Sequence, residues 1–271
     1  MKLPLYLAAL TLLLAISCQK VVTLDLREAA PQLAIEANLA DDGHPCVVQI
    51  SRSVSYTQTN TFPAVSGAVI TLSDDAGGLE TLAETSTPGQ YQGRTVLGQA
   101  GRRYTLRVQV EGSSYVAMST IPVAVAFTGL RAQKAPIGNN IQALPEFLDP
   151  AGMRNYYVFR QYRNGRLNKS IFLQNDEFTD GKPNNRGLGA GGGGGGTDDA
   201  DKLATGDSLR VEMQNVDADT YEYFRTLSLT RQSGGMATAS PANPKSNFTG
   251  GVLGYFSAHT RRQRSIIVPV L

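Results

Sequence analysis

The chain has 271 residues and carries 25 Lys+Arg against 23 Asp+Glu, which gives a net charge of +2. A charge this close to balance argues against a nucleic-acid partner, because such partners select strongly basic surfaces. The chain has two cysteines, Cys18 and Cys46, and no tryptophan.

The first residues have the pattern of a secretory signal. Lys2 precedes an apolar run from Leu3 to Ile16, which closes with Ala15-Ile16-Ser17-Cys18. The run is shorter than the roughly 20 residues that a membrane-spanning helix needs. We therefore expect a signal peptide over residues 1–17 and a lipid-modified Cys18 that holds the mature chain to a membrane. An ordinary cleaved signal with a cysteine nearby is the alternative.

After a lipidated tether over residues 18–31, the sequence indicates a series of short strands. Segments such as Tyr104–Val110 alternate apolar and polar residues, which places one face on a core and the other in water. Residues 32–122 are predicted to form an immunoglobulin-like or transthyretin-like β-sandwich. With Cys18 joined to lipid, Cys46 has no disulfide partner and is expected to be a small buried side chain. The expected strands are Leu33–Leu39, Cys46–Ser51, Ala68–Ser73, Leu79–Glu84, Tyr104–Val110 and Tyr115–Thr120.

A connecting segment over residues 123–147, with one strand and a loop, leads to a second β-rich domain over residues 148–271. Residues Ala218–Arg231 have aromatic and apolar side chains near helical spacing after a capping Asp217, and they predict a single helix. A glycine-rich stretch over residues 187–196 lacks the Lys-Ser/Thr ending of a phosphate-binding loop and is expected to be mobile. The strands expected in this domain are Tyr156–Tyr162, Ser170–Leu173, Ser208–Gln214 and Ser265–Val270.

The sequence shows no catalytic constellation. His44 lies in a turn and His259 precedes basic residues, so we expect both side chains at the surface. No local spacing of His, Cys and carboxylates fits a zinc site, and no nucleophile-elbow motif is present. We expect a protein that is not an enzyme and uses no metal or cofactor. A hydrolase with a dispersed site is the weaker alternative.

Two charged segments are the remaining candidates for a site. The turn Asn175–Gly181 places side-chain oxygens at alternate positions before a glycine, which is similar to half of a calcium loop. The terminal glutamate of such a loop is missing, so we expect these side chains to bond their own backbone. Arg261, Arg262 and Arg264 are expected on a solvated strand edge, with lipid phosphates as the alternative partner.

Several local patterns together resemble one known family. The most specific are the C-terminal Pro-x-Asn-Pro-x-Ser-Asn segment and the Gly-Tyr-Phe that follows it. The patterns are Leu24-Asp25-Leu26, Leu33–Leu39, Val65–Asp75, Gly101–Leu106, Asp149-Pro150, Asn155-Tyr156-Tyr157, Asn175–Gly181, Gly206-Asp207-Ser208, Tyr221–Phe224, Pro241–Asn247 and Gly250–Ala258. Nearly the whole chain resembles the domain-of-unknown-function 4249 family of lipoproteins from Bacteroidota.

The resemblance implies a cellular location and a partner, but no activity. Members of this family are expected to be outer-membrane lipoproteins, and their genes often lie beside those of TonB-dependent transporters. This implies an accessory role in the uptake of a ligand that the sequence does not identify. The residues after Cys18 lack the acidic run that often marks surface export, so the leaflet is left open. A structural or adhesion module that docks to envelope polymers is the alternative function.

The Gly250–Phe256 segment combines glycines with two large aromatic side chains. Glycine inside a strand commonly marks a bulge or a close backbone approach. Because neighbouring strand residues point to opposite faces, we expect one of Tyr255 and Phe256 to be inward and the other outward, in a strand that closes the second sandwich. The alternative makes Tyr255 and Phe256 an exposed aromatic anchor for a partner.

Overall fold

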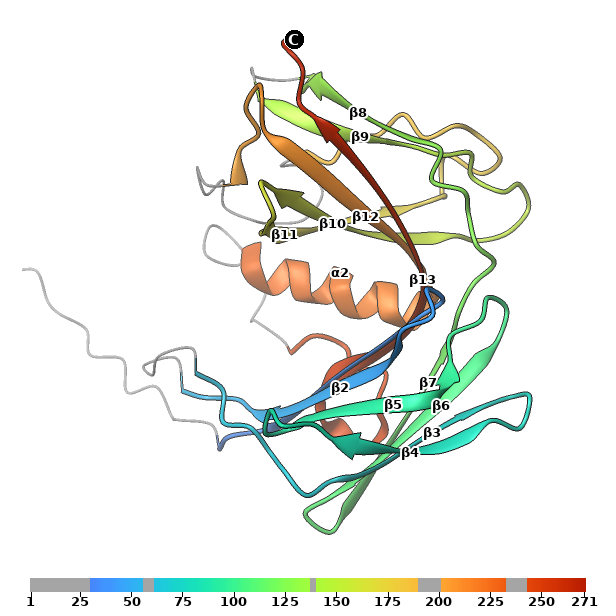
Figure 1. Ribbon diagram of the computed structural model, residues 1–271, viewed down its shortest axis with the longest axis vertical. Coiled ribbons are helices and arrows are strands. Elements are labelled where there is room, and N and C mark those ends of the chain that lie inside the picture. Colours follow the sequence, from blue (N-terminus) through green and yellow to red (C-terminus); the bar gives the residue numbers. More distant parts are fainter. Residues whose placement is uncertain (1–29, 56–60, 137–139, 190–200, 233–242) are drawn as a thin grey trace, which may run out of the picture. The chain divides into compact units, whose positions relative to one another are not determined.

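The computed structural model describes residues 30–55, 61–136, 140–189, 201–232 and 243–271. Residues Pro31–Leu271 form one compact unit. The predicted signal peptide, Cys18 and residues 190–196 of the glycine-rich stretch lie outside the described residues. The start of that stretch was expected to be mobile, but Leu188 is buried in a core and its N–H donates to the Ala143 carbonyl at 2.7 Å, which corrects the expectation there. In the described part the fold is mainly β with one α-helix, as predicted (Figure 1). The strands are β1 Leu33–Ala40, β2 Pro45–Arg52, β3 Val69–Asp74, β4 Leu79–Glu84, β5 Gln90–Leu97, β6 Arg103–Val110, β7 Ser113–Thr120, β8 Gly129–Lys134, β9 Ile141–Glu146, β10 Tyr156–Arg163, β11 Arg166–Asn175, β12 Ser208–Val216 and β13 Leu253–Ile267; the helices are α2 Ala218–Gln232 and the short 3-10 helix η3 Thr249–Gly251.

The N-terminal half is a β-sandwich, which we call the N-terminal lobe. One layer has the strand order β13-β1-β2-β5 and the other has the order β3-β6-β7, while β4 pairs with both β5 and β3 and so links the layers. Alternate residues of each layer point into a shared core, for example Ile35 and Val48 from one layer and Ile70 and Leu106 from the other. Cys46 lies in this core as a free, buried thiol, which confirms that prediction.

The C-terminal lobe is built on the antiparallel sheet β11-β10-β12-β13. Tyr157 and Phe159 of β10 pack with residues of the β8–β9 hairpin, whereas Val158 between them packs with residues of α2. Because neighbouring strand residues point to opposite faces, the hairpin and the helix cover opposite faces of this sheet (Figure 1). The hairpin falls within residues 123–147, where the sequence suggested one strand and a loop.

Strand β13 belongs to both lobes. Its first part, Leu253–His259, runs parallel to β1, and its second part, Thr260–Ile267, runs antiparallel to β12. Phe256 accordingly lies in the core of the N-terminal lobe. This corrects two expectations, since Tyr255 and Phe256 do not close the second sandwich and Ser265–Val270 is not a separate strand. The strand crosses between two sets of partners without a turn.

Helix α2 begins as predicted, at a cap formed by Asp217. The Asp217 Oδ1 atom accepts a hydrogen bond of 2.9 Å from the backbone N–H of Thr220, which satisfies one of the free N–H groups at the helix start. The other oxygen, Oδ2, accepts hydrogen bonds from the Ser119 hydroxyl at 2.6 Å and from the Thr120 N–H at 2.9 Å. The cap therefore also ties the helix start to β7.

Candidate functional site

Tyr255 and Phe256, the predicted inward and outward pair, are both buried. Phe256 lies in the N-terminal core, while Tyr255 points to the other face of β13 and lies under α2. Its ring centroid is 4.7 Å from that of Tyr223 and 4.9 Å from that of Phe224. The expectation that one of the pair faces outward is wrong, because α2 covers the face of β13 that would otherwise be exposed.

The two histidines have opposite environments. His44 is exposed in the β1–β2 turn, as expected, with a side chain that is 78% accessible. His259 is fully buried, which corrects the expectation of a surface residue. Its Nδ1 lies 2.9 Å from the Ser257 hydroxyl, and its Nε2 has no hydrogen-bond partner. Burial and the nearby Arg261 guanidinium lower the pKa of His259 to about 4, so the imidazole is neutral at pH 7.

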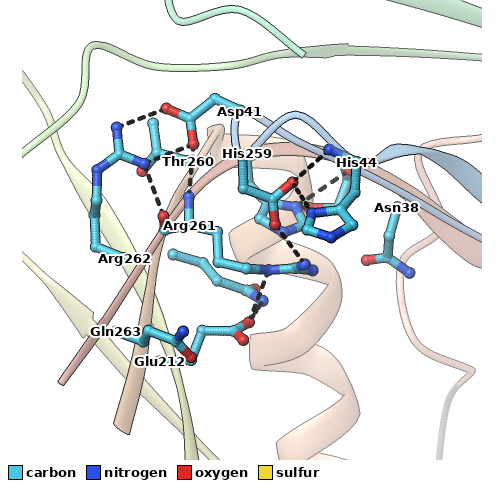
Figure 2. Close-up of polar contacts among 12 residues, drawn as sticks. Asn38, Asp41, His44, Glu212, His259, Thr260, Arg261, Arg262 and Gln263 are labelled. Carbon is cyan, nitrogen blue, oxygen red and sulfur yellow. Dashed lines mark hydrogen bonds and ion pairs between the residues drawn. The ribbon is translucent and has the colours of Figure 1, made fainter. Parts of the chain in front are cut away.

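A group of charged side chains surrounds the point where β13 passes from one lobe to the other (Figure 2). We call Asp41, Asp42, Glu212, Arg261 and Arg262 the junction cluster. Arg262 donates from Nη1 and Nη2 to the two oxygens of Asp41, each at 2.8 Å. Arg261 Nη1 lies 2.9 Å from Asp42 Oδ2, and Arg261 Nε lies 3.3 Å from Glu212 Oε1.

The junction cluster joins the β1–β2 turn to β12 and β13. Asp41 also accepts a hydrogen bond from the backbone N–H of Arg261, and its own N–H donates to the His259 carbonyl. Burial raises the pKa of Asp42, but hydrogen bonds from His44 and the charge of Arg261 outweigh it and hold that pKa below its ordinary value. Arg261 and Arg262 lie on a strand edge, because this part of β13 pairs with β12 and no longer with β1, but both are partly buried in ion pairs and are not solvated as expected. Arg264 alone of the three arginines is exposed as expected.

A second cluster forms where two loops of the C-terminal lobe meet. Asp149 follows β9, and Asp176 and Asp180 lie in the turn after β11. One carboxylate oxygen from each residue lies within 4.8 Å of the other two. A hollow of about 300 Å³ opens beside them, and we call the three aspartates and this space the acidic hollow. Its lining residues are Gly152, Met153, Arg154, Asp176, Glu177 and Asp180.

Each carboxylate of the acidic hollow accepts a hydrogen bond from a residue outside its own loop. Asp176 Oδ2 accepts from the Asn155 N–H at 2.7 Å, and Asp180 Oδ1 accepts from the Gly152 N–H at 2.8 Å. This corrects the expectation that the turn Asn175–Gly181 uses these side chains only for its own backbone.

Asp149 is the most buried of the three aspartates. It is 1% exposed, and its Oδ1 accepts a short hydrogen bond from the Tyr157 hydroxyl. Its Oδ2 has no hydrogen-bond partner. Burial raises the pKa of Asp149 and outweighs the lowering by Tyr157, and the charge of Asp176 adds to the rise. The sequence analysis singled out Asp149 only within a family pattern, because no local spacing connects it to Asp176.

In the described part of the chain, no helix combines the length and apolarity needed to cross a membrane.

Comparison with known proteins identifies a family but no activity. No curated protein matches the chain. Among solved structures, a two-domain fibronectin type-III segment of chicken tenascin is similar at 13% sequence identity and a TM-score of 0.24, covering 70% of this chain and 93% of that one. The family described as a domain of unknown function, DUF4249, matches residues 19–265. That match spans almost the whole sequence, and the chain belongs to the DUF4249 family.

Proposed function

We propose that this chain is a lipid-anchored accessory protein of the outer membrane, without catalytic activity, that binds a TonB-dependent transporter in the uptake of a ligand. The anchor is Cys18, the first residue after the predicted signal peptide. The compact unit begins at Pro31. A dozen intervening residues reach at most about 40 Å, so the tether would keep the unit close to the membrane surface.

The location and the transporter in this proposal rest on the signal-like N-terminus and the family resemblance. The observation that carries its non-enzymatic part is the burial of Ser257 and His259. A serine hydroxyl 2.9 Å from an imidazole is the geometry of a nucleophile beside its base. Here both residues are at most 1% exposed, so a substrate has no approach to the hydroxyl. A pKa of about 4 also makes His259 a poor proton acceptor near neutral pH. The pair therefore favours a structural role for this strand and supports a binding protein over a hydrolase.

Acylation can be tested with the two cysteines of the chain. Cells that express the full chain are fed a fatty acid with a clickable label, and the purified protein is examined for the label. Cys18→Ala should lose the label and leave the membrane fraction or remain an uncleaved precursor. Cys46→Ala is the matched control, because Cys46 is buried in the N-terminal core, and it should stay labelled. Label that persists on Cys18→Ala would refute the lipid anchor.

The partner can be tested by co-purification. The tagged, acylated chain is extracted in mild detergent, and the proteins recovered with it are identified by mass spectrometry. A TonB-dependent transporter in stoichiometric amount is the expected result. Recovery of the chain alone, or with envelope polymers in place of a transporter, would contradict the proposed partner and favour an adhesion module.

A further inference from the structure

We propose that Asp149, Asp176 and Asp180 bind one calcium ion in the acidic hollow. One oxygen from each carboxylate lies within 4.8 Å of the other two, as ligands of a single ion must. Calcium binds oxygen at about 2.3–2.6 Å, so two of its ligands can be up to about 5 Å apart. The proposal does not depend on the transporter, since it concerns only the side chains of these two loops.

The buried oxygen of Asp149 is the independent sign of a ligand. Asp149 is 1% exposed, and its Oδ2 atom has no hydrogen-bond partner. A buried carboxylate oxygen without a donor is costly. The Gly181 backbone N–H lies near the Asp149 carboxylate and lowers its pKa, but no donor of the described chain meets hydrogen-bond geometry at Oδ2. A cation beside Oδ2 would satisfy this oxygen.

The charge balance of the acidic hollow also calls for a cation. Three carboxylates that lie this close repel one another when ionised. From the described residues a single ion pair reaches them, between Arg154 Nε and Asp176 Oδ1 at a separation of 4.0 Å. The Arg154 side chain is largely exposed and holds Asp176 only loosely. A divalent ion would remove most of the repulsion among the three aspartates.

The ligand types favour calcium over other common metal ions. All three ligands are carboxylates, which hard cations prefer, and neither histidine nor Cys46 lies in this cluster, so a zinc site is disfavoured. Magnesium binds oxygen at about 2.0–2.1 Å and demands nearly ideal octahedral geometry, which limits opposite ligands to about 4.2 Å. Calcium binds at longer distances and accepts irregular geometry, so oxygens anywhere within the 4.8 Å limit can share one calcium ion. The hollow of about 300 Å³ leaves room for the waters that complete its coordination.

Calorimetry on the purified full chain tests the site directly. After treatment with EDTA and dialysis, calcium chloride is titrated into the protein, and we expect saturable binding of one ion per chain. Asp180→Asn keeps the acceptor for the Gly152 N–H but removes the charge, and Asp149→Asn does the same at the buried position. Each should weaken calcium binding by at least about tenfold. Asp219→Asn, an exposed acid in α2, is the control and should bind as the wild type does.

Terbium luminescence locates the ion. Tb³⁺ replaces calcium in oxygen sites, and a nearby tyrosine sensitises its emission; the chain has no tryptophan to compete. Tyr157 bonds Asp149 and is the expected donor. Tyr157→Phe should therefore lose most of the sensitised emission while calorimetric calcium binding persists. Absence of saturable calcium binding by the wild type, unchanged affinity in Asp180→Asn, or equal affinity for magnesium would overturn the proposal.

Discussion

His259 makes the stability of this chain depend on pH. Its pKa in the folded chain is about 4, against an ordinary value of 6.5, because the buried site and Arg261 both disfavour the charged form. Below pH 6.5 the unfolded chain takes up a proton that the folded chain does not bind until about pH 4. The contribution to stability is therefore complete above pH 6.5 and is lost as the pH falls towards 4.

We expect the free energy of unfolding to fall by about 2 kcal/mol between pH 7.5 and pH 5 because of this one residue. Urea unfolding at the two pH values measures the change. His259→Gln should lose most of the dependence, since glutamine does not titrate. His44→Gln is the control, because that side chain is exposed, and it should behave as the wild type. A His259→Gln chain that still loses 2 kcal/mol would assign the effect to other groups.

Strand β13 approaches β1 unusually closely at Gly254. The residue has a φ of +98°, and a Cβ atom placed on it would lie 2.0 Å from the Ile35 carbonyl oxygen. Because Ile35 belongs to the paired strand β1, this contact can be relieved only by moving the backbone. The glycine-rich segment thus marks a close backbone approach, as its sequence suggested.

Gly254→Ala should destabilise the chain by more than about 3 kcal/mol, because it combines a positive φ with a backbone clash. Gly251→Ala is the matched control. Its φ is +73°, but nothing lies within 4 Å of the added carbon, so it should cost only about 1 kcal/mol. Thermal or urea unfolding of the two variants gives the comparison. Equal losses would show that the clash is absorbed without moving β1.

The strands that the sequence predicted best are those with regular alternation. The ends of β1 and β6 differ from the prediction by one residue, because apolar side chains at every second position report a half-buried strand directly. The ends of β4 also match, although Leu82 is its only buried residue. Strand β5 was missed because Gly93, Arg94 and Thr95 interrupt its pattern. The polar middle of β13 resembled a surface segment, since its partners Asp41 and Asp42 lie more than 200 residues away in sequence.

The sequence indicated only part of the acidic hollow, because one of its three aspartates is distant in the chain. Asp176 and Asp180 are close in the chain, so their spacing alone indicated a turn similar to half of a calcium loop. Asp149 joins them only because β10 and β11 pair and bring the ends of two loops together. Burial of Asp149 also depends on packing that local pattern does not encode. Sites built across paired strands are the part of the molecule that a single sequence leaves open.

The two lobes share β13, and this should make them unfold together. Phe256 and Ala258 fill the N-terminal core, and Val268, just beyond the same strand, fills the C-terminal one. The junction cluster fixes the strand between these positions, with Asp41 6% and Arg262 36% exposed. Neither core keeps the strand that the lobes share if the other melts, so a single cooperative transition is expected for residues 31–271.

Two local probes can follow the lobes separately in urea. Cys46 reports on the N-terminal lobe, because burial raises the pKa of its thiol to about 12 and alkylation requires unfolding. Hydrogen exchange of β10 and β12 amides reports on the C-terminal lobe. The two midpoints should coincide in the wild type.

In Arg262→Gln both midpoints should fall together, with a loss of about 2 kcal/mol in the free energy of unfolding, because Asp41 keeps a largely buried charge without its partner. Arg264→Gln, two residues along the same strand and exposed, should stay within about 0.5 kcal/mol of the wild type. Midpoints that separate in Arg262→Gln would show that the junction cluster, and not the shared strand, couples the two lobes. Midpoints that are already separate in the wild type would mean that the lobes fold independently.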